Sequence, residues 1–447
     1  MWSLFCSDGR FSLKICQSGA CCDTGTLNTE DDNWELGQTD WFVGRQIGDC
    51  NGAVLDTNKN IEVILEHHGS NGGMLEWVRI HSWDPNAQWE CPINEKLDHS
   101  ENYRTRCAMK VLHSNPQNET VCNGNAKFCK LMFDQFLFPG SHNSGTGQSQ
   151  GSFQCGFKNQ DLNIVEQLEF GIRFLDIDSI KTDLSGCNGL ETGHGRNPEL
   201  SLYQCYGKMS SLLSELRRWL DTHPSEVVVI NFGNIEYPEE TIPALLETLK
   251  EIFPPLSTSV KLNSQYKKTG VWPTLGEAVE SNERIFVFIR DTIGAISGNN
   301  HPEVVKEIKV KPTDRELTSK NRSDATVMSS YEAKRVGDDC SYLMDTNELA
   351  CLRDKQLHPD FLKLSFFSAF GKGGTFRTEC IHKMARKCNV WPASAVRECA
   401  NVGLLFRPNF ILLDYPNYQS GAELTIIQLC NEINLERAQM VSLQTNN

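Results

Sequence analysis

The chain has 447 residues, of which 39% are hydrophobic and 22% charged, so it is long enough for one large domain and a smaller one. This composition argues against wholesale disorder. The formal net charge is -14, from 43 Lys and Arg against 57 Asp and Glu. Such a balance argues against nucleic-acid binding and against adsorption to anionic membranes through bulk charge. An anionic substrate must therefore be met by local positive charge.

The 18 cysteines gather near the two ends of the chain. The first group is Cys6, Cys16, Cys21, Cys22 and Cys50, and the second is Cys340, Cys351, Cys380, Cys388, Cys399 and Cys430. Because no C-x-x-C pairs are present, disulfides formed in an oxidising compartment are favoured over metal sites. Sequons at Asn118 and Asn321 agree with a secreted glycoprotein. We expect most cysteines to pair within these groups.

The start of the chain, "MWSLFCSDGRFSLKICQ", has no basic segment followed by an apolar core, so it does not predict a signal peptide. We expect that the chain begins downstream of its true start or is exported by another route. No apolar run has the length of a membrane span, and the C-terminal residues do not form a lipid-anchor signal.

Residues 1–125 predict a Cys- and Trp-rich β domain that resembles a sandwich. Residues 60–83 form two strand-like runs around Ser-Asn-Gly-Gly, which predicts a hairpin. Five tryptophans concentrate here: Trp34, Trp41, Trp77, Trp83 and Trp89. They are interpreted either as the core of this domain or, as the less favoured alternative, as a platform for carbohydrate or lipid headgroups.

Residues 126–447 predict strands that alternate with helices. The strand-like runs are 131–140, 172–180, 226–234, 284–292, 361–370 and 409–417, and helical runs are 209–224, 243–253 and 422–433. Repeated β-then-α order favours a parallel sheet, and this number of units predicts an α/β fold closed as a TIM-like (β/α)8 barrel, regular or irregular. An open doubly wound sheet is the alternative, weakened because no glycine-rich nucleotide loop follows the first strand.

Polar residues stand at the carboxyl ends of the predicted strands, where barrels of this class carry their chemistry. They are His142, Asn143, Asp176, Asp178, His194, Asn231, Arg290 and Asp414. Each one alone is more commonly a turn-forming or capping residue. Two histidines and three carboxylates on successive strand ends are hard to explain in that way.

Asp176 and Asp178 are two residues apart on one strand, so their side chains share a face of the sheet. With the amide oxygen of Asn143 they form an all-oxygen set, which suits calcium better than magnesium. The alternative is that each carboxylate pairs with a neighbouring Lys or Arg.

Two histidines can divide general-base and general-acid work near neutral pH, and Asp414 can fix the tautomer of one of them. Ser141 and Ser144 flank His142 and offer a competing serine nucleophile, but neither lies in a G-x-S-x-G elbow. Cleavage of a phosphodiester by an internal hydroxyl of the substrate needs no protein nucleophile, and it suits two histidines with a cation.

The blocks "LFPGSHNSGT", "VEQLEFGIRFLDID", "ETGHG", "SEVVVINF" and "NFILLDYPN" resemble, in the same order, those of the phosphatidylinositol-specific phospholipase C X-domain family. The resemblance covers most of residues 130–435. It implies an incomplete or irregular (β/α)8 barrel. It also implies cleavage of an inositol phospholipid or a glycosylphosphatidylinositol anchor between diacylglycerol and phosphate, through a cyclic inositol phosphate, at a membrane surface.

Carried over to this sequence, the resemblance makes His142 the base, His194 the acid and Asp414 the residue that orients His142. Asn143, Asp176 and Asp178 are similar to the ligands of the calcium-dependent branch, whereas the metal-independent branch has an arginine in place of Asp178. Three further residues are implied or suggested as substrate contacts: Arg290, Arg196 and Asn231.

The sequence departs from the family in "VVVINFGN", where the position of a charged residue in both branches is taken by Gly233. Asn231 or Asn234 would then substitute for the missing cation ligand. Two other functions stay open. One is a lipid- or glycan-binding protein that kept the barrel and lost turnover. The other is a glycerophosphodiesterase or sphingomyelinase D-like barrel, which the "PGSHNS" block fits poorly.

Overall fold

The structure is a computed structural model in which the chain divides into two compact units, Met1–Glu119 and Thr120–Asn447. In the first unit it describes residues 2–4, 10–17, 20–27, 40–42, 61–68, 73–81, 88–97 and 103–111. In the second it describes residues 120–148, 158–183, 187–195, 203–255, 258–296, 301–310, 326–333, 362–367, 381–389, 397, 409–419 and 425–445. The asparagines of both predicted sequons, Asn118 and Asn321, lie outside these ranges.

The described part of the first unit is an antiparallel sheet of eight strands in the order β3-β2-β5-β8-β7-β6-β1-β4. The strands are β1 Trp2–Leu4, β2 Arg10–Gln17, β3 Ala20–Leu27, β4 Asp40–Phe42, β5 Ile61–His68, β6 Gly73–His81, β7 Gln88–Leu97 and β8 Tyr103–Val111. The predicted hairpin over residues 60–83 is therefore wrong in its pairing. Both strands form and run in opposite directions, but β8 and β7 lie between β5 and β6 in the sheet.

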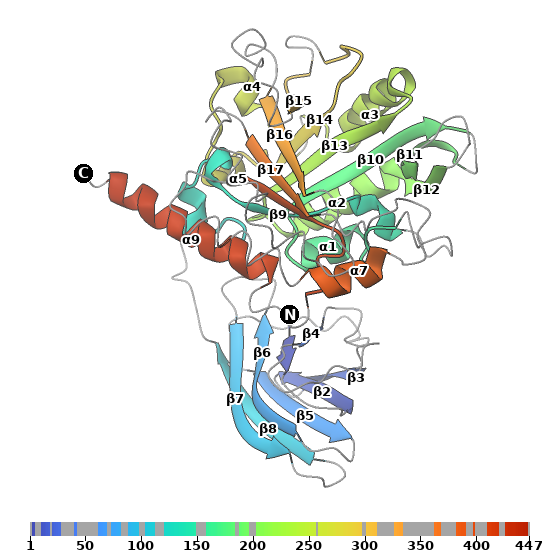
Figure 1. The fold of residues 1–447 in the computed structure, drawn as a ribbon. Coiled ribbons are helices and arrows are strands. Elements are labelled where there is room, and N and C mark those ends of the chain that lie inside the picture. The colour runs from blue at the N-terminus through green and yellow to red at the C-terminus, as the bar shows by residue number, and fades with distance from the viewer. Residues whose placement is uncertain are drawn as a thin grey trace. The chain divides into compact units, whose positions relative to one another are not determined.

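The second unit is an α/β fold with a mixed sheet (Figure 1). Its strands are β9 Phe138–Ser141, β10 Phe174–Thr182, β11 Gly189–Gly195, β12 Tyr203–Lys208, β13 Val228–Glu236, β14 Ile285–Ile289, β15 Val304–Val310, β16 Thr326–Ala333, β17 Leu362–Phe367 and β18 Phe410–Leu413. Parallel pairings run in the order β10-β13-β14-β15-β16-β17-β18-β9, and β9 also pairs with β10. β11 and β12 extend the sheet from β10 in antiparallel pairing.

Helices cover this sheet and include three that the sequence predicts. The α-helices are α1 Ile164–Glu169, α2 Met209–Thr222, α3 Pro238–Ile252, α4 Gln265–Thr269, α5 Leu275–Glu280, α7 Ile381–Cys388 and α9 Ile426–Thr445, and the 3-10 helices are η1 Ala126–Lys130, η2 Phe133–Gln135 and η3 Ser144–Gln148. The prediction for residues 131–140 is partly wrong, because only its end forms β9 and its first half contains η2. Among the described residues, no helix is long and apolar enough to cross a membrane.

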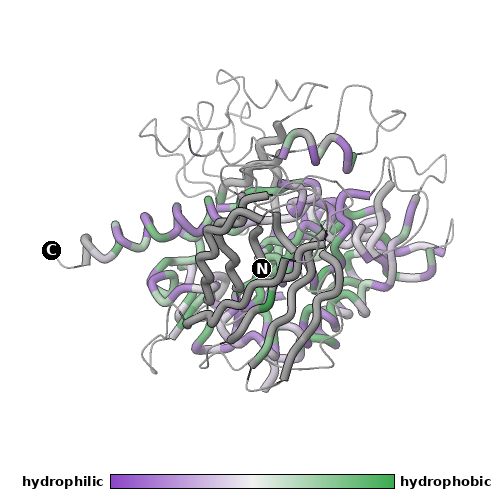
Figure 2. The backbone as a smooth tube through the Cα atoms, turned by 90° about the horizontal axis from the view of Figure 1, so that it is seen from below, coloured by the Kyte–Doolittle hydropathy of each residue, from purple (hydrophilic) through white to green (hydrophobic). Residues whose placement is uncertain are grey.

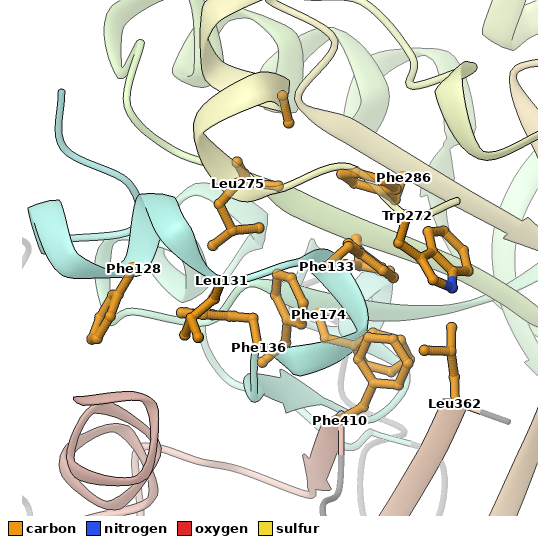
Figure 3. Packing of buried hydrophobic residues seen from close by; sticks show 14 of the residues in the cluster. Phe128, Leu131, Phe133, Phe136, Phe174, Trp272, Leu275, Phe286, Leu362 and Phe410 are labelled. Atoms are coloured by element: carbon orange, nitrogen blue, oxygen red, sulfur yellow. The ribbon is translucent and has the colours of Figure 1, made fainter. Parts of the chain in front are cut away.

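Aromatic side chains close the end of the sheet at which the strands begin (Figure 3). Phe133 of η2 lies at the centre, with its ring centroid 4.0 Å from Phe286 and 4.6 Å from Trp272. Phe174 and Phe410, the first residues of β10 and β18, stack 4.5 Å apart beside it. Because this end is filled by the core, the carboxyl ends of the strands are left for the polar residues.

Helix α9 fixes the position of β9. Hydrophobic and hydrophilic residues alternate along it (Figure 2), and its buried side chains pack on β18 and on Leu137, directly before β9. Asn434, fully buried in α9, donates from Nδ2 to the carbonyl of Leu137 and accepts the N–H of Leu137 at Oδ1, at 2.9 and 2.8 Å. These two bonds hold the backbone directly before β9, four residues upstream of Ser141.

Two disulfides are described, Cys122–Cys129 and Cys187–Cys205, and Cys16 and Cys388 are disulfide-bonded as well. Cys430 is an exception to the predicted pairing of the second group: it is a buried free thiol, and burial raises its pKa. Its surroundings are apolar because it packs in the core between α9 and the strands.

Candidate active site

The site forms on the edge of β10 that pairs first with β9 and then with β11. The first residues of β10 pair with β9 as far as Leu175, and its later residues pair with β11 from Ser179 onward. Residues 176–178 lie in the fork between the two partners. His142 follows directly after β9, and His194 lies on β11, two residues after the last residue paired with β10. The fork therefore brings the backbones of both predicted histidine positions to the two predicted aspartates.

Helix η3 packs closely against β11 beside this fork. A Cβ added to Gly145 would lie 2.0 Å from Thr192 Oγ1, so only glycine allows η3 to pack here. Thr192 precedes His194 by two residues, and Gly145 follows His142 by three. The side chain of His194 lies outside the described part of the chain, as does all of Arg196.

His142 and Asp414 form a hydrogen-bonded pair at the ends of adjacent strands. His142 Nδ1 lies 2.7 Å from Asp414 Oδ1, and the His142 N–H donates to the carbonyl of Leu413 at 2.9 Å. Each member of the pair is followed by a residue in the left-handed region, Asn143 with φ 47° and Tyr415 with φ 46°. Such backbone conformations are costly outside glycine and concentrate at functional sites.

Electrostatics at the fork favour the protonated form of His142. Burial by itself lowers the pKa of the imidazole, but the charge and hydrogen bond of Asp414 raise it, and Asp176 and Asp178 raise it further. The net effect is a pKa above the ordinary value for histidine. An imidazole that donates Nδ1–H to a carboxylate presents Nε2 as a proton acceptor. The pair therefore has the parts of a general base, and the two aspartates lie close enough to act on it.

A β-bulge decides which residues stand beside the two aspartates. Asp176 is opposite Asn231, but Asp178 is opposite Asn234, so β13 has one extra residue between them. Asn231 Nδ2 donates to Asp176 Oδ1 at 2.9 Å, and Asn234 Nδ2 donates to Asp178 Oδ2 at 3.2 Å. Asn234, and not Gly233, therefore lies beside Asp178.

The oxygen atoms of the site suit a hard cation. Both aspartates are buried, and buried Asn231 Oδ1 has no hydrogen-bond partner among the described residues. Asn143 donates from Nδ2 to Asn159 Oδ1 at 2.9 Å, so its own Oδ1 lies on the other side of the amide. No three His, Cys, Asp or Glu side chains in the described ranges gather as a metal-holding group. Any cation here would thus combine two carboxylates with amide oxygens.

The flanking serines are engaged elsewhere. The hydroxyls of Ser141 and Ser144 lie 2.7 Å apart, and Ser141 Oγ donates to Gln167 Oε1 at 2.6 Å. Both serines are fully buried. This geometry disfavours the serine nucleophile and explains the two hydroxyls of the "SHNS" block as part of the packing between β9 and α1.

Two arginines differ in their placement. Arg290 directly follows β14 and is exposed, and its N–H donates to the carbonyl of Phe232. Arg173 lies on the opposite side of β10 from the aspartates, where its Nε donates to Glu226 Oε2 at 2.7 Å and its guanidinium covers Trp219 of α2. Arg173 is thus a structural residue.

Sequence reasoning missed three residues of the site. Asn159 and Gln160 come from a segment without regular structure, and Tyr206 comes from β12. Burial, followed by the charge of Asp178, raises the pKa of the Tyr206 phenol, which places it near that carboxylate. Gln160 Nε2 donates to the His142 carbonyl at 2.7 Å. The sequence "KNQD" at residues 158–161 resembles any polar loop, so no local signal marks Asn159 and Gln160.

Parts of this chain are similar to known proteins. Residues 128–307 match the family model described as PI-PLC X 1. The resemblance predicted from the motifs is thereby confirmed for this stretch. The fungus Arthroderma benhamiae has a "PI-PLC X domain-containing protein 1", 30% identical over 176 residues, which are 38% of this chain and 51% of that protein. Its "Uncharacterized secreted protein" is 26% identical over 329 residues, covering 68% of this chain and 61% of the relative.

The chain thus spans between half and two thirds of the length of these curated relatives. Among solved structures, a phosphatidylinositol-specific phospholipase C of S. aureus is 18% identical, with a TM-score of 0.46, over 68% of this chain and 93% of the other. The Listeria monocytogenes enzyme is 16% identical, with a TM-score of 0.39, over 69% and 97%. These are distant similarities of fold.

Proposed function

We propose that the second unit is a phosphoric diester hydrolase that cleaves an inositol phospholipid, or the inositol phosphate of a lipid anchor, through a cyclic inositol phosphate. The observation that carries this proposal is the His142–Asp414 pair at 2.7 Å, set in the fork beside Asp176 and Asp178. The match of residues 128–307 to the PI-PLC X family model supports it. In the same proposal, the closed order of parallel strands is an irregular (β/α)8 barrel.

The first step uses a hydroxyl of the substrate as nucleophile. Asp414 holds the Nδ1–H of His142, and Nε2 takes the proton of the inositol 2-hydroxyl as its oxygen bonds to phosphorus. His194, on the strand across the fork, donates a proton to the diacylglycerol oxygen as its bond to phosphorus breaks. In the second step the roles reverse: His194 takes a proton from water as the water oxygen bonds to phosphorus, and His142 returns a proton to the inositol 2-oxygen as its bond to phosphorus breaks. No protein nucleophile is needed, in agreement with the buried serines.

Asn143, Asp176 and Asp178 would hold a calcium ion, with Asn231 Oδ1 as a further oxygen of the set. When bound, the ion would offset the charge that develops on the phosphoryl oxygens. Asn231 and Asn234 orient the two carboxylates in its absence through the hydrogen bonds from β13. Arg290 and Arg196 would supply positive charge to the phosphate from the rim of the site.

The proposed setting is extracellular, at a lipid surface. Disulfides at Cys122–Cys129 and Cys187–Cys205 fit an oxidising compartment, and one relative carries the name of a secreted protein. The phospholipid itself is the proposed partner.

The alternative is a protein that binds the lipid without turnover, and neutral Asn234 in place of a charged residue favours it. To separate the two, pure protein is incubated with labelled phosphatidylinositol vesicles in calcium or in chelator. The enzyme releases water-soluble label in calcium and little in chelator. A protein that sediments with the vesicles and releases no label is the binding form, and this result would overturn the proposed activity.

A further inference from the structure

Asn159 contacts both the residue that orients His142 and a proposed calcium ligand. It is fully buried in a segment that belongs to no helix or strand. Its Nδ2 donates to Asp414 Oδ1 at 2.7 Å, and its Oδ1 accepts from Asn143 Nδ2 at 2.9 Å. One amide therefore contacts the residue that orients the base and a residue that would hold the cation.

These contacts define the orientation of both neighbours. Asp414 Oδ1 accepts two donors, His142 Nδ1 and Asn159 Nδ2, each at 2.7 Å. Two donors on one oxygen fix the rotation of the carboxylate and hence the ring that it holds. Asn143 has its amide nitrogen directed to Asn159, so the oxygen is the end that remains for the site. Removing the Asn159 amide would therefore remove one hydrogen bond from each of these two groups.

Asn159 is itself held firmly. Thr146 Oγ1 accepts the backbone N–H of Asn159 at 3.0 Å and that of Gln160 at 3.1 Å. The Asn159 carbonyl accepts the N–H of Tyr415, the residue after Asp414, at 2.9 Å. The backbone of the segment is thus held by η3, which follows β9, and by the residue after Asp414.

We infer that Asn159 is a positioning residue that orients Asp414, and thereby favours the Nδ1–H tautomer of His142, and that also orients Asn143. The role rests on the proposed function for its catalytic meaning, but the geometry that it imposes is measurable without turnover. A purely structural Asn159 would satisfy buried polar groups and leave the imidazole unchanged.

The test compares Asn159→Ala and Asn159→Leu, which keeps the side-chain volume, with the wild type. The ¹⁵N spectrum of the imidazoles is recorded at a pH where they are neutral, and His142 is assigned by its loss in His142→Ala. The wild type should show His142 with its proton on Nδ1, and both Asn159 variants should show a mixture of the two tautomers. Loss of such an outer-shell partner also lowers kcat by about 10- to 100-fold.

Two further measurements separate positioning from stability. In an Asp414→Ala background, Asn159→Ala should lower kcat by less than about two-fold, because residues that act through each other are not additive. The matched control is Asn163→Ala, which removes the N-cap side chain of α1 four residues after Asn159. It should lower the melting temperature and leave kcat and the tautomer unchanged.

The outcomes are distinct. An unchanged tautomer in both Asn159 variants overturns the inference, whatever happens to activity. A shifted tautomer in a protein whose wild type does not cleave phosphatidylinositol supports the inference and contradicts the proposed function.

Discussion

The β-bulge in β13, opposite Asp176 and Asp178, allows calcium affinity to be predicted for a variant of Asn234. Asn234 Nδ2 lies 3.2 Å from Asp178 Oδ2, so Asn234→Asp would place two carboxylates at about that separation. Two such charges repel by roughly 5 kcal/mol at an effective dielectric constant of 20. Asn234 is exposed, and screening by water reduces this to about 1–2 kcal/mol. A bound divalent ion relieves the repulsion, so calcium should bind roughly 5- to 30-fold more tightly to Asn234→Asp.

Calorimetric titration with calcium measures the affinity directly, and the melting temperature without calcium should fall in the same variant. The matched control is Gly233→Asp, the position that the sequence alone selects. Because Gly233 is buried inside the bulge, a carboxylate there should destabilise the fold without tightening calcium binding. Tighter binding in Gly233→Asp than in Asn234→Asp would refute the register on which the reasoning depends.

Three further predictions concern the base and the covalent framework. His142→Ala should lower kcat by roughly 100- to 10,000-fold with little change in melting temperature, and equal losses of both would indicate a structural role. The midpoint of the acid side of the pH profile of kcat/KM should lie above the ordinary histidine pKa of about 6.5. Because Asp414 raises the pKa of His142, Asp414→Asn should move this midpoint to lower pH. An unmoved midpoint would show that Asp414 does not raise the pKa. By linkage, the stabilising contribution of His142 is complete below about pH 6.5 and is lost as the pH rises through the raised pKa. Removing Cys187–Cys205, with a sequence separation of 18, should cost about 3 kcal/mol of unfolding free energy, and an unchanged denaturation midpoint would refute that value.

The sequence alone predicts much of the second unit and the backbone positions of its site. Strand ends recur in the α/β pattern, and polar residues at those ends converge because parallel strands point the same way. For this reason His142 and Asp414, 272 residues apart, are found in contact as predicted. The alternation of side chains along β10 likewise predicts that Asp176 and Asp178 share a face.

Other features depend on tertiary structure that local patterns do not encode. The bulge in β13 shifts the register by one residue, whereas simple alternation from the Asp176–Asn231 pair places Gly233, and not Asn234, opposite Asp178. Asn159 reaches Asp414 only after the segment packs beneath the loops that follow β9 and β18. The hairpin over residues 60–83 was wrong because turn residues predict a reversal of the chain but not the strand that pairs afterwards.

In the proposed mechanism, an inositol hydroxyl attacks the phosphate while His142 takes its proton. ³¹P NMR of phosphatidylinositol vesicles with the pure protein and calcium identifies the first phosphorus-containing product. The wild type should give the signal of a five-membered cyclic phosphodiester together with diacylglycerol, and His142→Ala should not. Phosphatidic acid as the product, or an acyclic inositol phosphate formed without any cyclic precursor, would contradict this mechanism.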